Sequence, residues 1–167
     1  MSTTDISSAT RQLLLTEIRI MRRLNHKNIL KIHEVHETPN KVYLIMDLME
    51  HGDFFDYISK AALNEPRIKR IMYQLVEGLA YLEQHGVIHR DIKPANLMVK
   101  FEAGNPYPTI VIGDFGLACY KDQSILCKGS GTHGYMPPEV VISKLVAGIV
   151  YTSKVDVFAA GVIFFKL

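Results

Sequence analysis

The residues best suited to chemistry lie together in one short segment, residues 89–96, which reads His-Arg-Asp-Ile-Lys-Pro-Ala-Asn. An aspartate on a tight loop, here Asp91, can accept a proton from a hydroxyl group. Lys93 lies two residues further on and can reach a phosphate group during its transfer, and the side-chain carbonyl of Asn96 can ligate Mg²⁺. Each residue alone would suit an ordinary charged loop, but the combination favours phosphate chemistry.

A second carboxylate that could bind a metal ion follows residues 89–96 at a short distance along the chain. Asp114 comes directly after the apolar run at residues 110–112 and is followed by Phe115 and Gly116. The end of a strand holds a side chain at a fixed point, and a carboxylate oxygen is a hard ligand that suits Mg²⁺. The Asp-Phe-Gly string is a weak signal by itself, but after residues 89–96 it indicates a shared metal–phosphate site.

The helices that must position these residues are predicted by apolar residues at helical spacing and by end signals. Four helices are expected: residues 10–25, Asp53–Lys60 with Asp53 as its N-cap, a long helix that starts at Pro66 and stops at Gly86, and Lys154–Leu167. The last of these is apolar on nearly every face, so we expect it to be buried.

Short runs rich in β-forming residues predict the strands. Residues 29–35 and 42–48 flank a turn-like connector and are expected to form an antiparallel hairpin, and two more strands are expected at residues 97–101 and 109–112. Residues 116–138 show no periodicity, so they predict a long irregular loop, and long loops inside compact domains are commonly functional.

In this order, the motifs resemble the eukaryotic protein kinase family over essentially the whole chain. The resemblance implies that Asp91 is the catalytic base, that Lys93 contacts the γ-phosphate, and that Asn96 and Asp114 are Mg²⁺ ligands. It therefore implies ATP and Mg²⁺ as cofactors, and transfer of the γ-phosphate to hydroxyl groups of protein substrates. Lys93 together with Thr132 is the pattern of serine/threonine kinases.

The resemblance also implies a set of nucleotide-binding residues. Glu17 resembles the helix glutamate that pairs with the ATP-binding lysine, and Met46 resembles the gatekeeper at the end of the last upper-lobe strand. The backbone groups of Asp47 and Met49 would bond adenine, and Met98 would form the floor beneath it. Because a run of methionines is more often core packing, these adenine contacts have less sequence support than Asp91 and Asp114.

Several further positions follow the family pattern. Residues 131–139 resemble the end of an activation segment, with Pro137 in place of the usual alanine, and Asp156 resembles the buried aspartate that anchors the catalytic loop. The family's regulatory spine is expected at four positions anchored at Asp156, namely Met21, Ile32, His89 and Phe115. Residues 52–58 are most similar to the calcium/calmodulin-dependent kinase group.

The implied fold class is α+β, a partial two-lobe kinase fold without the first three strands of the upper lobe and the last helices of the lower lobe. Residues 1–48 would be the remnant of the upper lobe, and residues 49–167 the hinge and lower lobe. No Gly-x-Gly-x-x-Gly loop precedes Glu17. Two interpretations remain open: a fragment of a serine/threonine kinase that is inactive alone, or a truncated, pseudokinase-like binding or scaffold protein.

The composition of the chain indicates which kinds of partner and which cellular location to expect. The 19 Lys and Arg residues are balanced by 17 Asp and Glu residues, which argues against nucleic acid as a partner. The most apolar run, residues 155–165, is far too short to span a membrane, and only two cysteines are present. The expected location is the cytoplasm, with the nucleus left open. Any calmodulin-type regulator is expected to bind outside these 167 residues.

Overall fold

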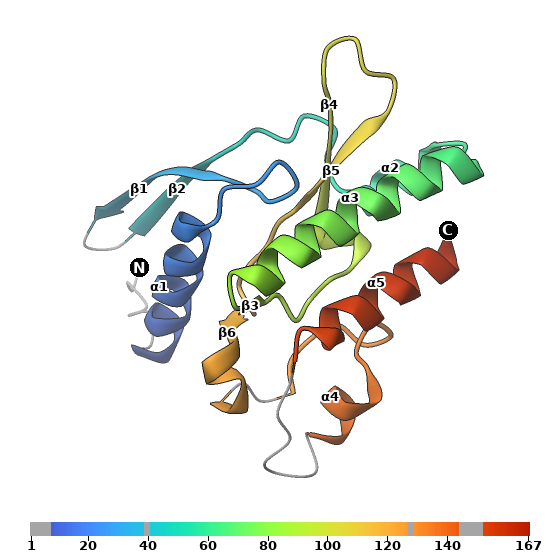
Figure 1. Cartoon of the computed structure of the whole chain (residues 1–167). Coiled ribbons are helices and arrows are strands. Elements are labelled where there is room, and N and C mark those ends of the chain that lie inside the picture. The colour runs from blue at the N-terminus through green and yellow to red at the C-terminus, as the bar shows by residue number, and fades with distance from the viewer. Residues whose placement is uncertain (1–7, 39–40, 127–128, 144–151) are drawn as a thin grey trace, which may run out of the picture.

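The computed structural model describes residues 8–38, 41–126, 129–143 and 152–167, arranged as a smaller part around α1, β1 and β2 and a larger, mainly helical part (Figure 1). The helices are α1 (Ser8–Arg23), α2 (Phe54–Lys60), α3 (Glu65–Gln84), α4 (Pro138–Ile142) and α5 (Lys154–Lys166), with 3₁₀ helices η1 (Pro94–Asn96) and η2 (Lys121–Leu126). The strands are β1 (Ile32–Thr38), β2 (Lys41–Met46), β3 (Val87–Ile88), β4 (Leu97–Phe101), β5 (Pro108–Ile112) and β6 (Cys119–Tyr120). This mixture of helices and strands confirms the predicted α+β class.

The helix ends follow the local signals in the sequence. The side chain of Asp53 caps α2 by accepting a hydrogen bond from the backbone N–H of Asp56, at 2.8 Å. Helix α3 is capped by Asn64 and carries Pro66 in its first turn, and Gly86, with φ +67°, follows its end. The predicted signals at Asp53, Pro66 and Gly86 are therefore present, while the cap at Asn64 was not predicted.

Each sheet is a pair of antiparallel strands. The pairs β1–β2 and β4–β5 confirm the predicted hairpin and strands, and the register of β1–β2 shifts between Ile32 and Glu34. Residues 39–40, at the tip of the predicted hairpin, lie outside the described residues. The third pair, β3–β6, was not predicted, and residues 116–138 are not wholly irregular because they contain β6 and η2.

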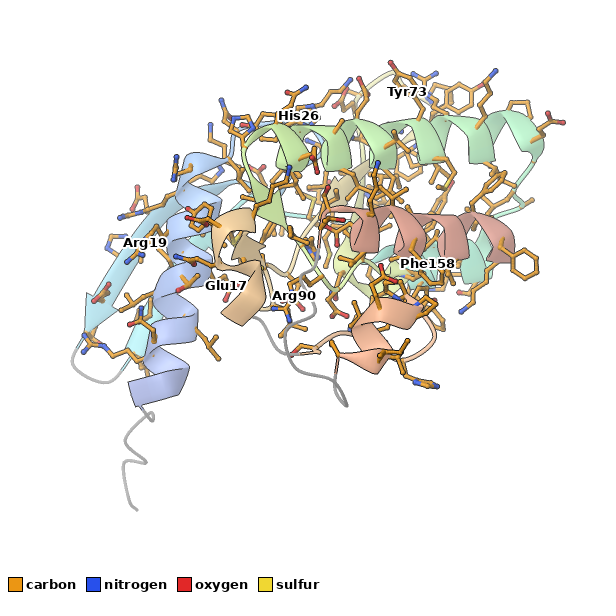
Figure 2. The ribbon with its side chains drawn as sticks, turned by 60° about the horizontal axis from the view of Figure 1, so that its bottom comes forward. Glu17, Arg19, His26, Tyr73, Arg90 and Phe158 are labelled. Carbon is orange, nitrogen blue, oxygen red and sulfur yellow. The ribbon has the colours of Figure 1, made fainter. Side chains whose placement is uncertain are left out.

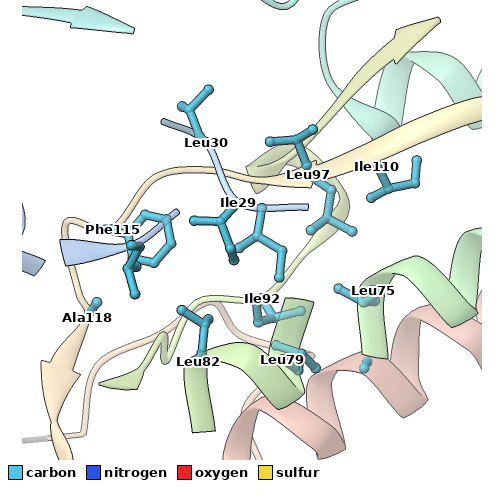
Figure 3. Close-up of a cluster of buried hydrophobic side chains, with 14 of the residues drawn as sticks. Ile29, Leu30, Leu75, Leu79, Leu82, Ile92, Leu97, Ile110, Phe115 and Ala118 are labelled. Atoms are coloured by element: carbon cyan, nitrogen blue, oxygen red, sulfur yellow. The ribbon is translucent and has the colours of Figure 1, made fainter. Parts of the chain in front are cut away.

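The main core lies between α3 and the strands that flank the segment 89–96. Leu75, Leu79 and Leu82 of α3 face Ile92 and Ile110, and all five side chains are buried (Figure 3). Burying a side chain of this size contributes about 1.5–3 kcal/mol, so the core fixes the segment between β3 and β4 firmly against α3. None of the described helices has the length and apolar character needed to cross a membrane.

The smaller and larger parts are joined by backbone hydrogen bonds around Asn28. The N–H of Ile112 donates to the carbonyl of Asn28 at 2.9 Å, and the N–H of Leu30 donates to the carbonyl of Ile112 at 2.9 Å. The buried side-chain amide of Asn28 donates to the carbonyl of Ile110 at 2.7 Å. The segment that follows α1 is thereby held against β5, the strand that leads into Asp114.

Helix α5 forms as predicted, but the prediction that it is buried on nearly every face is wrong. It packs against α3 through the side that carries Ala159, Ala160 and Ile163, and Val155 lies in a separate buried cluster with Val140 of α4. On its other side, Phe164 is 60% exposed and Phe165 is 90% exposed. The reason is that α3 can cover one face of α5 only, and none of the described residues covers the opposite face.

Candidate active site

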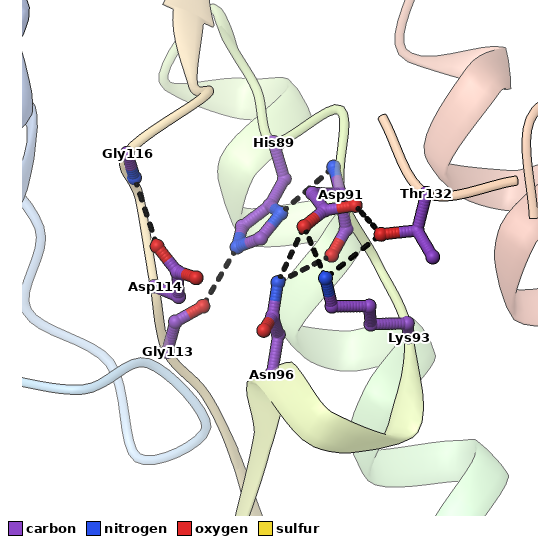
Figure 4. Close-up of polar contacts among 8 residues, drawn as sticks. All are labelled: His89, Asp91, Lys93, Asn96, Gly113, Asp114, Gly116 and Thr132. Atoms are coloured by element: carbon purple, nitrogen blue, oxygen red, sulfur yellow. Dashed lines mark hydrogen bonds and ion pairs between the residues drawn. The ribbon is translucent and has the colours of Figure 1, made fainter. Parts of the chain in front are cut away.

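Asp91 lies at the centre of a compact polar cluster in the turn between β3 and η1 (Figure 4). Its Oδ1 accepts a hydrogen bond from the Thr132 hydroxyl at 2.6 Å, and its Oδ2 lies 2.8 Å from the Lys93 ammonium. The side-chain amide of Asn96 donates to Asp91 Oδ2 at 2.9 Å and to the Asp91 backbone carbonyl at 2.8 Å. Three predicted site residues therefore converge with Thr132, which lies 41 positions further along the chain than Asp91.

These contacts decide the charge of Asp91. Burial on its own would raise the pKa of this carboxyl group, but hydrogen bonds from Lys93, Thr132 and Asn96, together with the positive charge of Lys93, hold its pKa below the ordinary value. Asp91 is therefore ionised at neutral pH and able to accept a proton. Lys93 also donates to the Thr132 hydroxyl at 2.7 Å, which fixes the hydroxyl between the two charged groups.

Asp114 is tied to the same cluster through His89. The His89 ring Nε2 lies 2.9 Å from the carbonyl of Gly113, and the ring packs edge-on against Phe115 with ring centres 4.9 Å apart. Asp114 itself is exposed, adopts a left-handed φ of +53°, and accepts a hydrogen bond from the Gly116 N–H at 3.2 Å. The Gly113 carbonyl, next to Asp114, and the backbone N–H of Asp91 thus contact the same His89 ring (Figure 4), and a joint role of the two aspartates in metal binding stays a prediction.

The turn that carries Asp91 is anchored from α5. Asp156 is 3% exposed, and its two carboxylate oxygens accept hydrogen bonds from the backbone N–H groups of His89 at 2.8 Å and Arg90 at 2.7 Å. Arg90 has a left-handed φ of +72°, a conformation that costs a residue other than glycine about 1–3 kcal/mol. Burial raises the pKa of Asp156, while His89, Arg90 and their N–H groups act in the opposite direction. The predicted anchoring contact is present.

The predicted spine positions form a continuous buried set. Met21, Ile32, His89 and Phe115 are all buried, and His89 and Phe115 touch directly. Met21, Ile32 and Phe115 belong to one buried hydrophobic cluster, which Phe115 connects to the His89 ring.

Glu17 lies on α1 and faces the Asp114 segment. Its Oε2 is 3.9 Å from the point where a side chain at Gly116 would begin. Burial, and then the negative charge of Asp114, raise the pKa of Glu17. No cation among the described residues forms an ion pair with Glu17, so its pairing with a lysine stays a prediction.

The four residues predicted to surround adenine lie in two segments, residues 46–49 and β4. Met46 ends β2, and the backbone N–H of Asp47 donates to the Lys31 carbonyl at 3.2 Å. Met49 and Met98 are half-buried and pack against the core, and the side chain of Met98 approaches the position of a Gly113 side chain to 3.5 Å. Their contacts with adenine stay predictions.

The structure also shows contacts that the sequence did not indicate. The Asp47 carboxylate lies 2.6 Å from the His33 ring, and the Gly113 carbonyl bonds His89. The first contact spans 14 positions across the β1–β2 hairpin, and the second joins residues 24 positions apart.

The whole chain, residues 1–167, matches the family model described as the protein kinase domain. The chain belongs to the protein kinase domain family. This kinase domain is 36% identical to a probable myosin light chain kinase of Dictyostelium discoideum, over 98% of the chain and 52% of that protein. It is 38% identical to calcium/calmodulin-dependent protein kinase type 1 of Macrobrachium nipponense, over 92% of the chain and 43% of that protein. It is 37% identical to the human serine/threonine-protein kinase H1, over 94% of the chain and 36% of that protein.

These comparisons confirm the resemblance to serine/threonine kinases and the partial kinase fold. The kinase domain chain spans between 36% and 52% of the length of these three relatives. Protein kinases in general use ATP and a divalent metal ion.

Proposed function

We propose that this kinase domain transfers the γ-phosphate of ATP to serine or threonine hydroxyl groups of proteins. The observation that carries the proposal is the cluster around Asp91, in which an ionised carboxylate, an ammonium group and an alcohol lie within 2.9 Å of one another. The names of the relatives, which are serine/threonine and calcium/calmodulin-dependent kinases, support it.

In this proposal, Asp91 accepts the proton of the attacking hydroxyl. The Thr132 hydroxyl already donates to Asp91 Oδ1 at 2.6 Å, so this oxygen is oriented toward an alcohol donor. Lys93 is held beside the carboxylate and would contact the transferring phosphate, where its charge offsets the negative charge of the phosphoryl oxygens. Much of the rate enhancement would come from position and charge, since phosphoryl transfer needs little covalent chemistry from the protein.

Asn96 and Asp114 are proposed to hold Mg²⁺. The amide nitrogen of Asn96 is engaged with Asp91, which leaves its carbonyl oxygen as the group able to ligate a cation, and Asp114 offers an exposed carboxylate. Among the described residues, no group of three His, Cys, Asp or Glu side chains could hold a metal ion. A donor set of two protein oxygens fits Mg²⁺, which takes its remaining ligands from phosphates and water. When bound, the ion would neutralise phosphate charge.

The nucleotide would lie over these ligands, with Glu17 toward the phosphates and Met46, Asp47, Met49 and Met98 around adenine. The position of Glu17 beside Gly116 and Asp114 supports this role. The pKa of Glu17 is raised first by burial and then by the negative charge of Asp114, and a cation between the two carboxylates would favour their ionised forms.

The test uses the longest natural protein that contains these 167 residues. Asp91→Asn should lower kcat on the order of 10²–10⁴-fold, the usual contribution of a general base, with ATP affinity almost unchanged. Asp114→Ala should weaken Mg²⁺-dependent ATP binding as well as turnover. Asp122→Asn, on the exposed turn η2, serves as the matched control. Identical effects of the first two variants on affinity and turnover would contradict the separation of base from metal ligand.

A binding or scaffold role is the second candidate, favoured by the unpaired state of Glu17 among the described residues. No Gly-x-Gly-x-x-Gly loop precedes Glu17 to cover the phosphates, so we propose that the 167-residue chain turns over little ATP by itself. Robust turnover by the purified 167-residue chain, abolished by Asp91→Asn, would refute this. Absence of turnover in the longest natural protein, with the fold intact, would favour the scaffold role.

A further inference from the structure

A second concave surface lies between α3 and the connection from β4 to β5. This hollow, which we call the α3–β5 groove, has a volume of about 610 Å³ and shares no residue with the cluster around Asp91. Figure 1 shows the β4–β5 connection rising beside α3, and Figure 2 labels Tyr73 on the outer side of that helix. The residues that carry the argument are Lys69, Arg70, Tyr73, Gln74, Glu102 and Tyr107.

The floor of the groove is fixed by Gln74. Its amide nitrogen donates to the Pro108 carbonyl at 3.0 Å, and its amide oxygen accepts from the Ile110 N–H at 3.1 Å. The buried Asn28 amide donates to the same oxygen at 3.3 Å. Helix α3 and β5 are therefore held at a constant separation, so a ligand would meet a groove that needs little ordering on binding.

The walls present aromatic and cationic side chains in fixed positions. The Arg70 guanidinium lies over the Tyr107 ring, 4.6 Å from its centre, and the Tyr73 side chain is 65% exposed. Exposed tyrosine and arginine are the residue types that contribute most to protein interfaces. Pockets for small molecules are lined mainly by apolar side chains, whereas most of the residues that line this groove are charged or polar types. The groove is therefore better suited to a peptide.

The charge of the groove points to the kind of peptide. At its end, Lys27 is neutralised by Glu77 at 2.9 Å, whereas neither Lys69 nor Arg70 forms an ion pair with any described residue. Glu102 is the one other carboxylate among the lining residues, so cations outnumber carboxylates by three to two. Carboxylates of a ligand would thus be drawn to Lys69 and Arg70 and away from Glu102.

We propose that the α3–β5 groove docks an extended, acidic segment of a partner protein, with carboxylates on Lys69 and Arg70 and an aromatic side chain on Tyr73. This interaction does not depend on phosphate transfer, because the groove and the Asp91 cluster have no residue in common. It would tether a substrate or regulator to a surface separate from the one that does the chemistry.

The probe is a fluorescein-labelled peptide, Gly-Glu-Glu-Tyr-Glu-Glu-Pro-Gly, and its matched partner in which every glutamate is glutamine. Binding to the full chain is followed by fluorescence polarisation. The acidic peptide should bind, and the glutamine peptide should bind about tenfold more weakly or worse, as expected when charge-assisted contacts are lost. The affinity of the acidic peptide should fall as salt is raised.

The matched variants separate the groove from general attraction to positive charge. Lys69→Glu combined with Arg70→Glu should weaken binding about tenfold or more, while Arg11→Glu combined with Arg22→Glu, on exposed positions of α1, should change it less than about twofold. Tyr73→Ala tests the aromatic contact without altering charge, and its side chain is too exposed for the fold to depend on it.

Three results would overturn the proposal. These are no binding of the acidic peptide at millimolar concentration by the folded chain, equal binding of the two peptides, and equal losses in the α3 and α1 double variants. Competition by a single-stranded oligonucleotide at the same affinity would also overturn it, because the groove would then attract any polyanion.

Discussion

Removing the carboxylate of Asp156 should destabilise the chain through the turn that carries Asp91. Asp156 is buried in α5, and its two oxygens are the acceptors for the N–H groups of His89 and Arg90, at 2.8 and 2.7 Å. Asp156→Ala would leave the buried N–H of His89 and the part-buried N–H of Arg90 without that acceptor. It would also release the restraint that holds Arg90 at φ +72°.

The expected loss follows from these contacts. Each buried donor left without a partner costs about 1–3 kcal/mol, so the two together cost roughly 2–6 kcal/mol. Part of this loss is offset, because burying the Asp156 carboxylate, whose pKa is raised, has a desolvation cost that alanine does not have. We expect Asp156→Ala to lower the free energy of unfolding by about 2–4 kcal/mol. Asp156→Asn keeps one acceptor and should cost less, about 1–3 kcal/mol.

Urea unfolding of the 167-residue chain, followed by circular dichroism at pH 7, measures the loss. The control is Asp122→Ala on the exposed turn η2, which should change the free energy of unfolding by less than about 0.5 kcal/mol. Hydrogen exchange of the His89 and Arg90 amides gives a local measurement, and both should exchange faster in Asp156→Ala.

A particular pattern of results would refute the reasoning. If Asp156→Ala unfolded at the same urea concentration as Asp122→Ala, and the amides of His89 and Arg90 kept their protection, the Asp156 carboxylate would not be an anchor. If Asp156→Asn lowered the free energy of unfolding more than Asp156→Ala, the loss would come from the amide N–H group that asparagine introduces, and not from the lost acceptor.

Two further predictions concern the packing and charge around the site. Gly78→Ala should lower the free energy of unfolding by about 1–3 kcal/mol, because the new carbon would lie 2.8 Å from Ile112 Cδ1. Gly161→Ala should instead raise the free energy of unfolding by up to about 1 kcal/mol, because the new carbon would meet nothing within 4 Å. Equal shifts of the urea midpoint in the two variants would contradict this prediction. Glu17 has a raised pKa, so its ionisation costs stability as pH rises from its ordinary pKa through its folded-state pKa. Glu17→Gln should therefore be more stable than the parent chain at pH 7, and this difference should disappear below about pH 4. Urea titrations measure the difference. Lower stability of the variant at pH 7 would show that the Glu17 carboxylate has a favourable partner.

Much of the local structure could be predicted because its causes are local. The cap at Asp53, the start near Pro66 and the stop at Gly86 depend on neighbours within one turn of helix, and all three are present. The apolar stripe of α3 likewise specifies which face is buried, since residues three and four apart share a face.

The strand pair β3–β6 could not be predicted for the opposite reason. Each strand has two residues, too few for any alternation of apolar and polar residues to be recognised, and the partners are 31 to 33 positions apart. The exposed face of helix α5 could not be predicted for a related reason. Its composition indicates a need for burial, but composition does not say which neighbours are available to cover each face.

The site shows the same difference between what local sequence can predict and what depends on tertiary packing. The sequence by itself determined which groups could do chemistry, because Asp91, Lys93, Asn96 and Asp114 have the residue types and spacing that phosphate transfer needs. Only the tertiary structure decided that Thr132 bonds Asp91, that His89 joins Asp91 to the Asp114 segment, and which N–H groups the anchor predicted at Asp156 holds. Those contacts connect residues 24 to 67 positions apart, and they form because packing of α3, α5 and β5 brings the segments together, which no local pattern encodes.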